Sequence, residues 1–96
     1  MAEAVAFAAR YRRTPGTLWR RVLDEVLLFP PDATEPLSIT KPGALVWTLL
    51  AEPISVADLV DQVATRFDAP RAQVQIDLEG LVAHLLTAGA ICAVHP

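Results

Sequence analysis

The sequence contains very few of the residues from which catalytic and metal sites are built. Its 96 residues include one cysteine, Cys92, and two histidines, His84 and His95. A single cysteine excludes an internal disulfide bond, and Cys92 with His95 would supply two ligands where a zinc site uses roughly three or four. Neither histidine has a neighbouring group in the sequence that marks it as a catalytic acid or base. We therefore predict neither an enzyme nor a bound metal or cofactor.

Long apolar runs and phosphate-binding loops are also missing. No stretch approaches the ~18 consecutive apolar residues that a membrane span needs. The N-terminal apolar patch is short and carries Glu3 where a secretion signal would be basic. The four glycines are scattered and form no Gly-rich phosphate loop. Together with the lone cysteine, these absences favour a cytoplasmic protein, and Met1 favours a freestanding chain.

Basic residues are scarce in most of the chain. Five of the eight basic residues lie before residue 22. From residue 22 onward the chain has ten acidic residues and only three basic ones. The resulting anionic body argues against duplex DNA as a partner. The arginines near the N-terminus would either touch an acidic partner or, as is more common, be solvated. The five are Arg10, Arg12, Arg13, Arg20 and Arg21, and the three later basic residues are Lys41, Arg66 and Arg71.

Short strands are the first pattern that is present. Leu37–Thr40 alternates apolar and polar side chains, which is the period-2 pattern of a half-buried strand. Two earlier apolar segments, Leu18–Leu23 and Val26–Phe29, are separated only by Asp24 and Glu25. A two-residue connection predicts a tight hairpin. The three segments therefore predict a three-stranded antiparallel meander.

Helical periodicity takes over after the third strand. Apolar residues recur at three- and four-residue spacing in three segments, each of which is expected to lay one stripe on a core. Thr40 is expected to cap the first helix and Ser55 the second, and Gly89 fits the left-handed position that ends the third. The predicted helices span residues 42–50, 55–66 and 70–88.

Strands followed by helices, with a tight turn between the last two helices, predict an α+β domain. The arrangement expected is winged helix-turn-helix-like, with a three-stranded antiparallel sheet followed by three helices. We assign this domain to residues 16–96, with Ile91–Val94 as a short terminal strand. Residues 1–15 are expected to be an N-terminal arm, either helical or disordered, because no apolar stripe shows what they would pack on.

The third helix is poorly suited to reading DNA. A winged helix-turn-helix protein places the second helix of its pair in the major groove. Here that helix carries Arg71 as its only Lys or Arg and presents Asp77 and Glu79 to a polyanion. A DNA-binding regulator is therefore retained only as an alternative. A non-catalytic subunit that docks on a partner enzyme is another.

A free sheet edge is the better candidate for a functional site. An uncovered edge offers unpaired amide and carbonyl groups to an extended peptide. The strand Leu37–Thr40, with the third helix beside it, would frame such a groove. The helix would contribute Leu78 and Val82, unless these are ordinary core residues, and Gln75 and Glu79 for polar contacts at the rim.

Four segments of the chain carry a family resemblance. In this order, VLLFPP, LSITKPGALVWTLL, ISVADLVDQVATRFD and DLEGLVAHLLTAGAI resemble the PqqD-like family of peptide chaperones. These are recognition elements for ribosomally synthesised and post-translationally modified peptides (RiPPs). The resemblance covers roughly Leu18 to Ile91. Lys41 and Pro42 depart from it, because the family usually has a small polar residue after Asn or Thr.

The resemblance implies a function. Family members bind the leader segment of a precursor peptide as an added strand and present it to a modifying enzyme, such as a radical SAM protein or a cyclase-linked leader peptidase. The product and a homodimer are left open. Carried onto this sequence, the peptide contacts fall on Leu37, Ser38, Ile39 and Thr40 in the third strand and on Gln75, Leu78, Glu79 and Val82 in the third helix.

Overall fold

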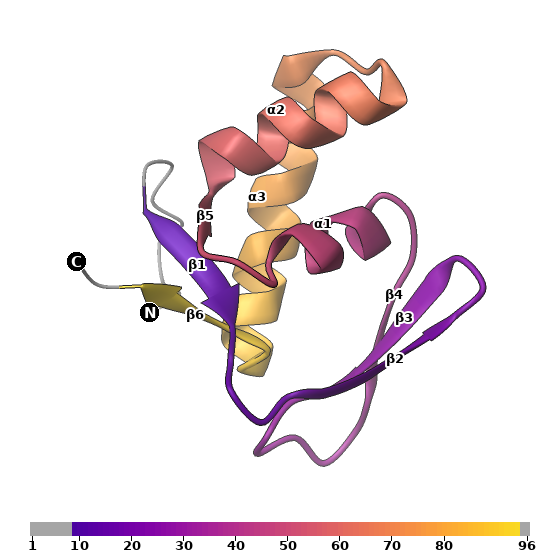
Figure 1. The fold of residues 1–96 in the computed structure, drawn as a ribbon, viewed down its shortest axis with the longest axis vertical. Helices are drawn as coiled ribbons and strands as arrows, with labels where there is room; N and C mark the ends of the chain where they lie inside the picture. The colour runs from indigo at the N-terminus through magenta and orange to yellow at the C-terminus, as the bar shows by residue number, and fades with distance from the viewer. Residues whose placement is uncertain (1–8, 95–96) are drawn as a thin grey trace.

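Within residues 9–94, two small antiparallel sheets and three helices make up the α+β fold (Figure 1). The structure is a computed structural model and describes residues 9–94. The elements in chain order are β1 (Arg10–Arg13), β2 (Leu18–Val22), β3 (Glu25–Phe29), β4 (Leu37–Ile39), α1 (Gly43–Leu49), β5 (Ile54–Ser55), α2 (Val56–Phe67), α3 (Arg71–Ala88) and β6 (Ile91–Val94).

The predicted antiparallel meander is confirmed. Its strand order is β2-β3-β4, with Leu18 opposite Phe29 and Val26 opposite Ile39. Side chains alternate along β3, so Val26 and Leu28 are buried while Phe29 is exposed. The meander therefore has one face on the core and one outer face toward solvent.

The turn between β2 and β3 lies one residue earlier than predicted. Leu23 and Asp24 form the connection, and Glu25 already belongs to β3. Leu23 adopts a φ of 56°, in the left-handed region that leucine rarely enters. Glu25 is held in the sheet because it pairs with Val22 and its carboxylate accepts a hydrogen bond from Ser38. These contacts fix the register that the turn residues alone did not reveal.

A second sheet, which the sequence did not predict, has the strand order β5-β1-β6. Arg10 pairs with Val94, and Tyr11 is buried between its neighbours on both sides. The prediction of a helical or disordered arm is therefore wrong for Arg10–Arg13, whereas residues 1–8 of that arm lie outside the described residues. The predicted terminal strand Ile91–Val94 is confirmed as the partner of β1.

The helix ends follow the predicted signals with one exception. Ser55 caps α2 by accepting a hydrogen bond from the Asp58 amide at 3.1 Å, and Gly89 ends α3 with a φ of 81°. The prediction that Thr40 caps α1 is wrong. Pro42 occupies the cap position without a side-chain hydrogen bond, and Thr40 contributes only its carbonyl, which accepts from the Ala44 amide.

The core lies around α1, which is placed between α2 and the β2–β3 hairpin (Figure 1). Val46, Trp47 and Leu50 have no exposed surface, and they belong to one cluster with the inner face of the meander and the stripes of α2 and α3. Burial of these side chains contributes roughly 1.5–3 kcal/mol each. Packing on α1 thus fixes β4 and α3 next to each other.

Candidate functional site

Within residues 9–94 both outer strands of the meander, β2 and β4, have one edge that pairs with no other strand, and the edge of β4 is the one beside α3. Within residues 9–94, β4 pairs with β3 and with no other strand, because β1 and β6 form a sheet of their own. The backbone groups on the far side of β4 are therefore available to an incoming strand. A strand already paired with this edge of β4 would exclude a guest peptide, and residues 9–94 contain no such strand.

A groove of about 310 Å³ runs between β4 and α3. Apolar side chains from both elements line it, and polar residues lie among them: Ser38 and Thr40 on one wall, and Asp77 and His84 on the other. Such a surface suits an extended peptide that alternates apolar and polar side chains. The remaining lining residues are Ile39, Pro42, Gly43, Leu78 and Leu81.

Gly43 lets the walls of the groove approach each other. A Cβ at this position would lie 3.3 Å from the Cβ of Ile39 and 3.5 Å from Cδ2 of Leu81. A side chain at residue 43 would therefore require Ile39 to shift by a few tenths of an ångström, whereas its contact with Leu81 would be an ordinary one. Gly43 therefore lies at the point where β4, α1 and α3 approach one another.

The structure brings together only some of the predicted site residues. Ser38, Ile39, Thr40 and Leu78 line the groove. Ile39 and Leu78 are largely buried, at 7% and 1% exposure, so they form its floor rather than its rim. The other four, which do not line it, are Leu37, Gln75, Glu79 and Val82. Val82 is a core residue with no exposed surface. The peptide-binding role of all eight residues stays a prediction.

Sequence reasoning missed the part of α3 that faces β4. Asp77, Leu81 and His84 follow each other at helical spacing on one flank of the buried stripe, whereas Gln75 and Glu79 lie on the opposite flank. The stripe alone does not say which flank faces the sheet. Leu81 was the available signal, because it extends the apolar surface on the side that turns out to face the groove.

The arginines near the N-terminus do not gather on α3. Arg10 donates to the carbonyl of Pro53, Arg13 to the carbonyl of Trp47, and Arg21 to the hydroxyl of Thr48. Burial lowers the pKa of the Arg13 guanidinium from its ordinary value, which lies so far above neutrality that the group stays charged. These three arginines thus make hydrogen bonds within the protein and do not form a basic face on α3.

The described residues offer no cluster of three or more His, Cys, Asp or Glu side chains that could hold a metal ion. Cys92 lies on β6, and His95, its suggested companion, lies outside the described residues. Between residues 9 and 94 no helix is both long and apolar enough to cross a membrane.

Comparison with known families places this fold. The family model described as Coenzyme PQQ synthesis protein D (PqqD) matches residues 25–91. This match extends from β3 to the start of β6, covers more than half of the chain and includes every residue that lines the groove. No curated protein and no solved structure shows a significant match. The chain therefore belongs to the PqqD family, the family of RiPP recognition elements.

Proposed function

We propose that the protein binds the leader segment of a ribosomally made precursor peptide as a fourth strand on β4 and presents it to a modifying enzyme. The observation that carries this proposal is the unpaired edge of β4 beside the groove formed with α3. Membership of the PqqD family supports the same role. The leader would gain backbone hydrogen bonds from β4 and place alternate side chains on the groove floor.

The size of the site favours reversible binding. β4 has three residues, so an added strand gains about four hydrogen bonds at ~0.5–1.5 kcal/mol each. Two apolar anchors on Ile39 and Leu81 would add ~1.5–3 kcal/mol each. Ordering a flexible peptide costs ~2–5 kcal/mol, and association costs several more. This small net free energy of binding suits a leader peptide that must be released after modification.

A different surface is available for the modifying enzyme. The outer face of the meander exposes Leu18, Val22, Leu27 and Phe29, and its apolar hollow shares no lining residue with the groove. Arg20 lies at the middle of β2, one of the two edge strands of this face. Pairing β2 with a second copy about its centre would set two Arg20 side chains against each other, which is unfavourable. An enzyme surface with apolar and acidic residues is the better complement.

A titration with leader peptide tests the proposal. The probe is a fluorescein-labelled peptide from a precursor encoded beside the gene, with binding followed by anisotropy. Leu81→Glu, which puts a charge on the groove floor, is expected to reduce affinity at least about tenfold. Ile76→Glu is the matched control, because Ile76 is an exposed apolar residue of α3 outside the groove. Equal losses for both variants, or no saturable binding by the wild type, would count against the proposal.

A further inference from the structure

Two more hollows adjoin the peptide groove. A hollow of about 380 Å³ shares Pro42 and Asp77 with the groove and continues over the ends of α2 and α3. It shares Lys41 and Phe67 with a third hollow of about 450 Å³. The three hollows are therefore neighbours that follow one another from the edge of β4, past Pro42 and Phe67, to the space between α2 and the β2–β3 hairpin.

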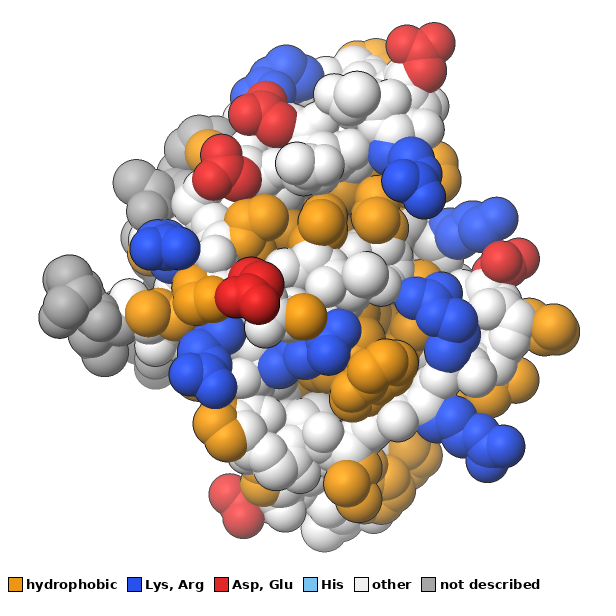
Figure 2. All heavy atoms as spheres, in the orientation of Figure 1, with side chains coloured by type: hydrophobic (Ala, Val, Ile, Leu, Met, Phe, Trp, Pro, Cys, Tyr) orange, Lys and Arg blue, Asp and Glu red, His pale blue; other side chains and the backbone are white. Residues whose placement is uncertain are grey.

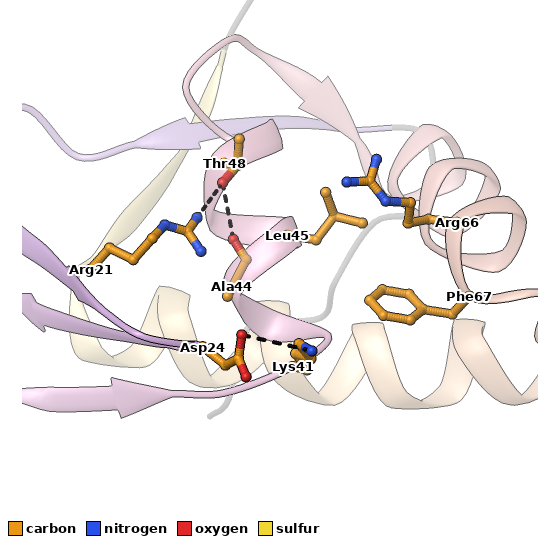
Figure 3. A pocket seen from close by; sticks show the side chains of 8 residues that line it. All are labelled: Arg21, Asp24, Lys41, Ala44, Leu45, Thr48, Arg66 and Phe67. Atoms are coloured by element: carbon orange, nitrogen blue, oxygen red, sulfur yellow. Dashed lines mark hydrogen bonds and ion pairs between the residues drawn. The ribbon is translucent and has the colours of Figure 1, made fainter.

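The third hollow is cationic. Arg21 from β2, Lys41 before α1 and Arg66 from α2 surround it, and Asp24 is its single acidic residue (Figure 3). Three of the chain's eight basic residues thus border one hollow in a protein with a net charge of −3. Figure 2 shows Lys and Arg side chains on both sides of the space between α2 and the hairpin.

Two of the three cations contact neighbouring side chains. Arg21 donates a hydrogen bond to Thr48 at 3.0 Å, and Thr48 donates in turn to the carbonyl of Ala44 at 3.1 Å. Lys41 lies 3.7 Å from Asp24 in an exposed ion pair. Arg66 and Phe67 point into the hollow from α2 and face Leu45 (Figure 3). The hollow therefore offers positive charge beside an apolar wall.

We propose that this cationic hollow binds an acidic side chain of the precursor peptide, located N-terminal to the segment that pairs with β4. The inference rests on the proposed function. Antiparallel pairs are about two to three times commoner than parallel ones, and a guest antiparallel to β4 begins where β4 ends, next to Thr40 and Pro42. Residues preceding its paired segment then lie along the neighbouring hollows toward Phe67 and the three cations. From its N-terminus, the leader would thus contain an acidic residue that binds in the cationic hollow, then an apolar residue, and then an extended segment that pairs with β4.

A carboxylate that belongs to a peptide bound in the groove suits the cationic hollow better than a free anion does. Contacts between exposed charges are weak, at about 0–1 kcal/mol for each pair, and salt screens them. A carboxylate carried on a peptide that is already bound in the groove has a high effective concentration at the hollow. The expected gain is therefore modest, about fivefold to tenfold in affinity, and depends on binding in the groove.

Peptides selected from a displayed random library on the whole chain provide the probe. Each selected peptide is synthesised with its upstream Glu or with Gln in that place, and both are titrated by anisotropy. We expect the Glu peptide to bind about fivefold to tenfold more tightly at low salt. In Lys41→Gln/Arg66→Gln the difference is expected to disappear. The control Arg12→Gln/Arg71→Gln, which loses the same charge at exposed positions outside the three hollows, is expected to keep it.

The outcomes separate this inference from the function on which it rests. Amide shifts at Ser38, Thr40 and His84 report binding in the groove. If they appear but the Glu and Gln peptides bind equally, the acidic position is refuted and the proposed function stands. If the library yields no peptide that shifts these residues, both fail. Recovery of affinity when Arg66→Glu is combined with a peptide Glu→Arg change would establish the direct contact.

Discussion

The guanidinium group of Arg13 donates two hydrogen bonds to the main-chain carbonyl of Trp47, from Nε at 3.0 Å and from Nη2 at 2.7 Å. The same group lies 4.6 Å from the ring centre of Trp47 and 4.8 Å from that of Trp19. The two rings pack edge to face, with their centres 6.3 Å apart. Arg13 therefore joins β1, α1 and β2, and so links the two sheets through the helix that supports the groove.

Arg13→Ala is expected to lower the free energy of unfolding by about 2–4 kcal/mol. The estimate combines charged hydrogen bonds at ~1.5–3 kcal/mol with cation–π contacts at ~0.5–2 kcal/mol. Arg13→Lys should lose about half as much, because an ammonium group keeps the charge but not the two-pronged geometry. Guanidinium chloride unfolding followed by circular dichroism measures both. Arg12→Ala, at an exposed neighbouring position, should change the free energy of unfolding by less than about 0.5 kcal/mol. If Arg12→Ala lowered it as much as Arg13→Ala does, the contacts of Arg13 with the two tryptophans would not explain the effect.

Gly43→Ala is expected to separate stability from peptide binding. Alanine gains up to about 1 kcal/mol in helix propensity, which offsets the shift that its Cβ forces on Ile39 at 3.3 Å. Unfolding should therefore change little, whereas the narrowed groove should weaken leader binding several-fold. Gly80→Ala is the control, since a Cβ there meets nothing within 4 Å and should only stabilise α3. Unchanged leader affinity in Gly43→Ala would show that the groove is not the binding site.

Leu27→Lys and Phe29→Lys are expected to weaken binding of the modifying enzyme while leaving leader affinity unchanged. Both residues lie on the outer face of the meander, with 37% and 44% of their surface exposed. Charge in an apolar interface must be desolvated, and hot-spot substitutions of this kind cost about 2 kcal/mol or more. Co-purification and calorimetry with the enzyme encoded beside the gene measure the effect. Ile76→Lys is the matched control on α3, and an equal loss there would refute docking on this face.

Local signals in the sequence were sufficient for the meander and for most helix ends. Ser55 and Gly89 act through their own backbone and nearest neighbours, so their positions could be read directly. The position of Leu23 in the turn could not be predicted, because nothing in its side chain favours the left-handed conformation. Only the pairing of Glu25 with Val22 fixes the turn. The same applies to β1, whose arginine-rich segment becomes a strand through partners far away in the sequence.

The candidate site was predictable in its strand and not in its helix. Ser38 and Thr40 follow from the position of the edge strand, which the apolar alternation already indicated. The choice between the flank of Glu79 and the flank of His84 depends on how α3 is rotated against β4. That rotation is set by packing around Gly43 and Leu81, a tertiary contact that periodicity does not encode.

The pairing of Arg10 with Val94 imposes an order on biosynthesis. On the ribosome β1 emerges before both of its partners, and it has only the two-residue strand β5 to pair with until β6 has been translated. Its other edge must wait until all the elements from β2 to α3 have been translated, which takes several seconds at about 5–20 residues per second. The late strand β6 therefore completes the sheet that β1 begins, and a nascent chain stalled before Ile91 would display an unsatisfied β1 to the quality-control machinery of the cell.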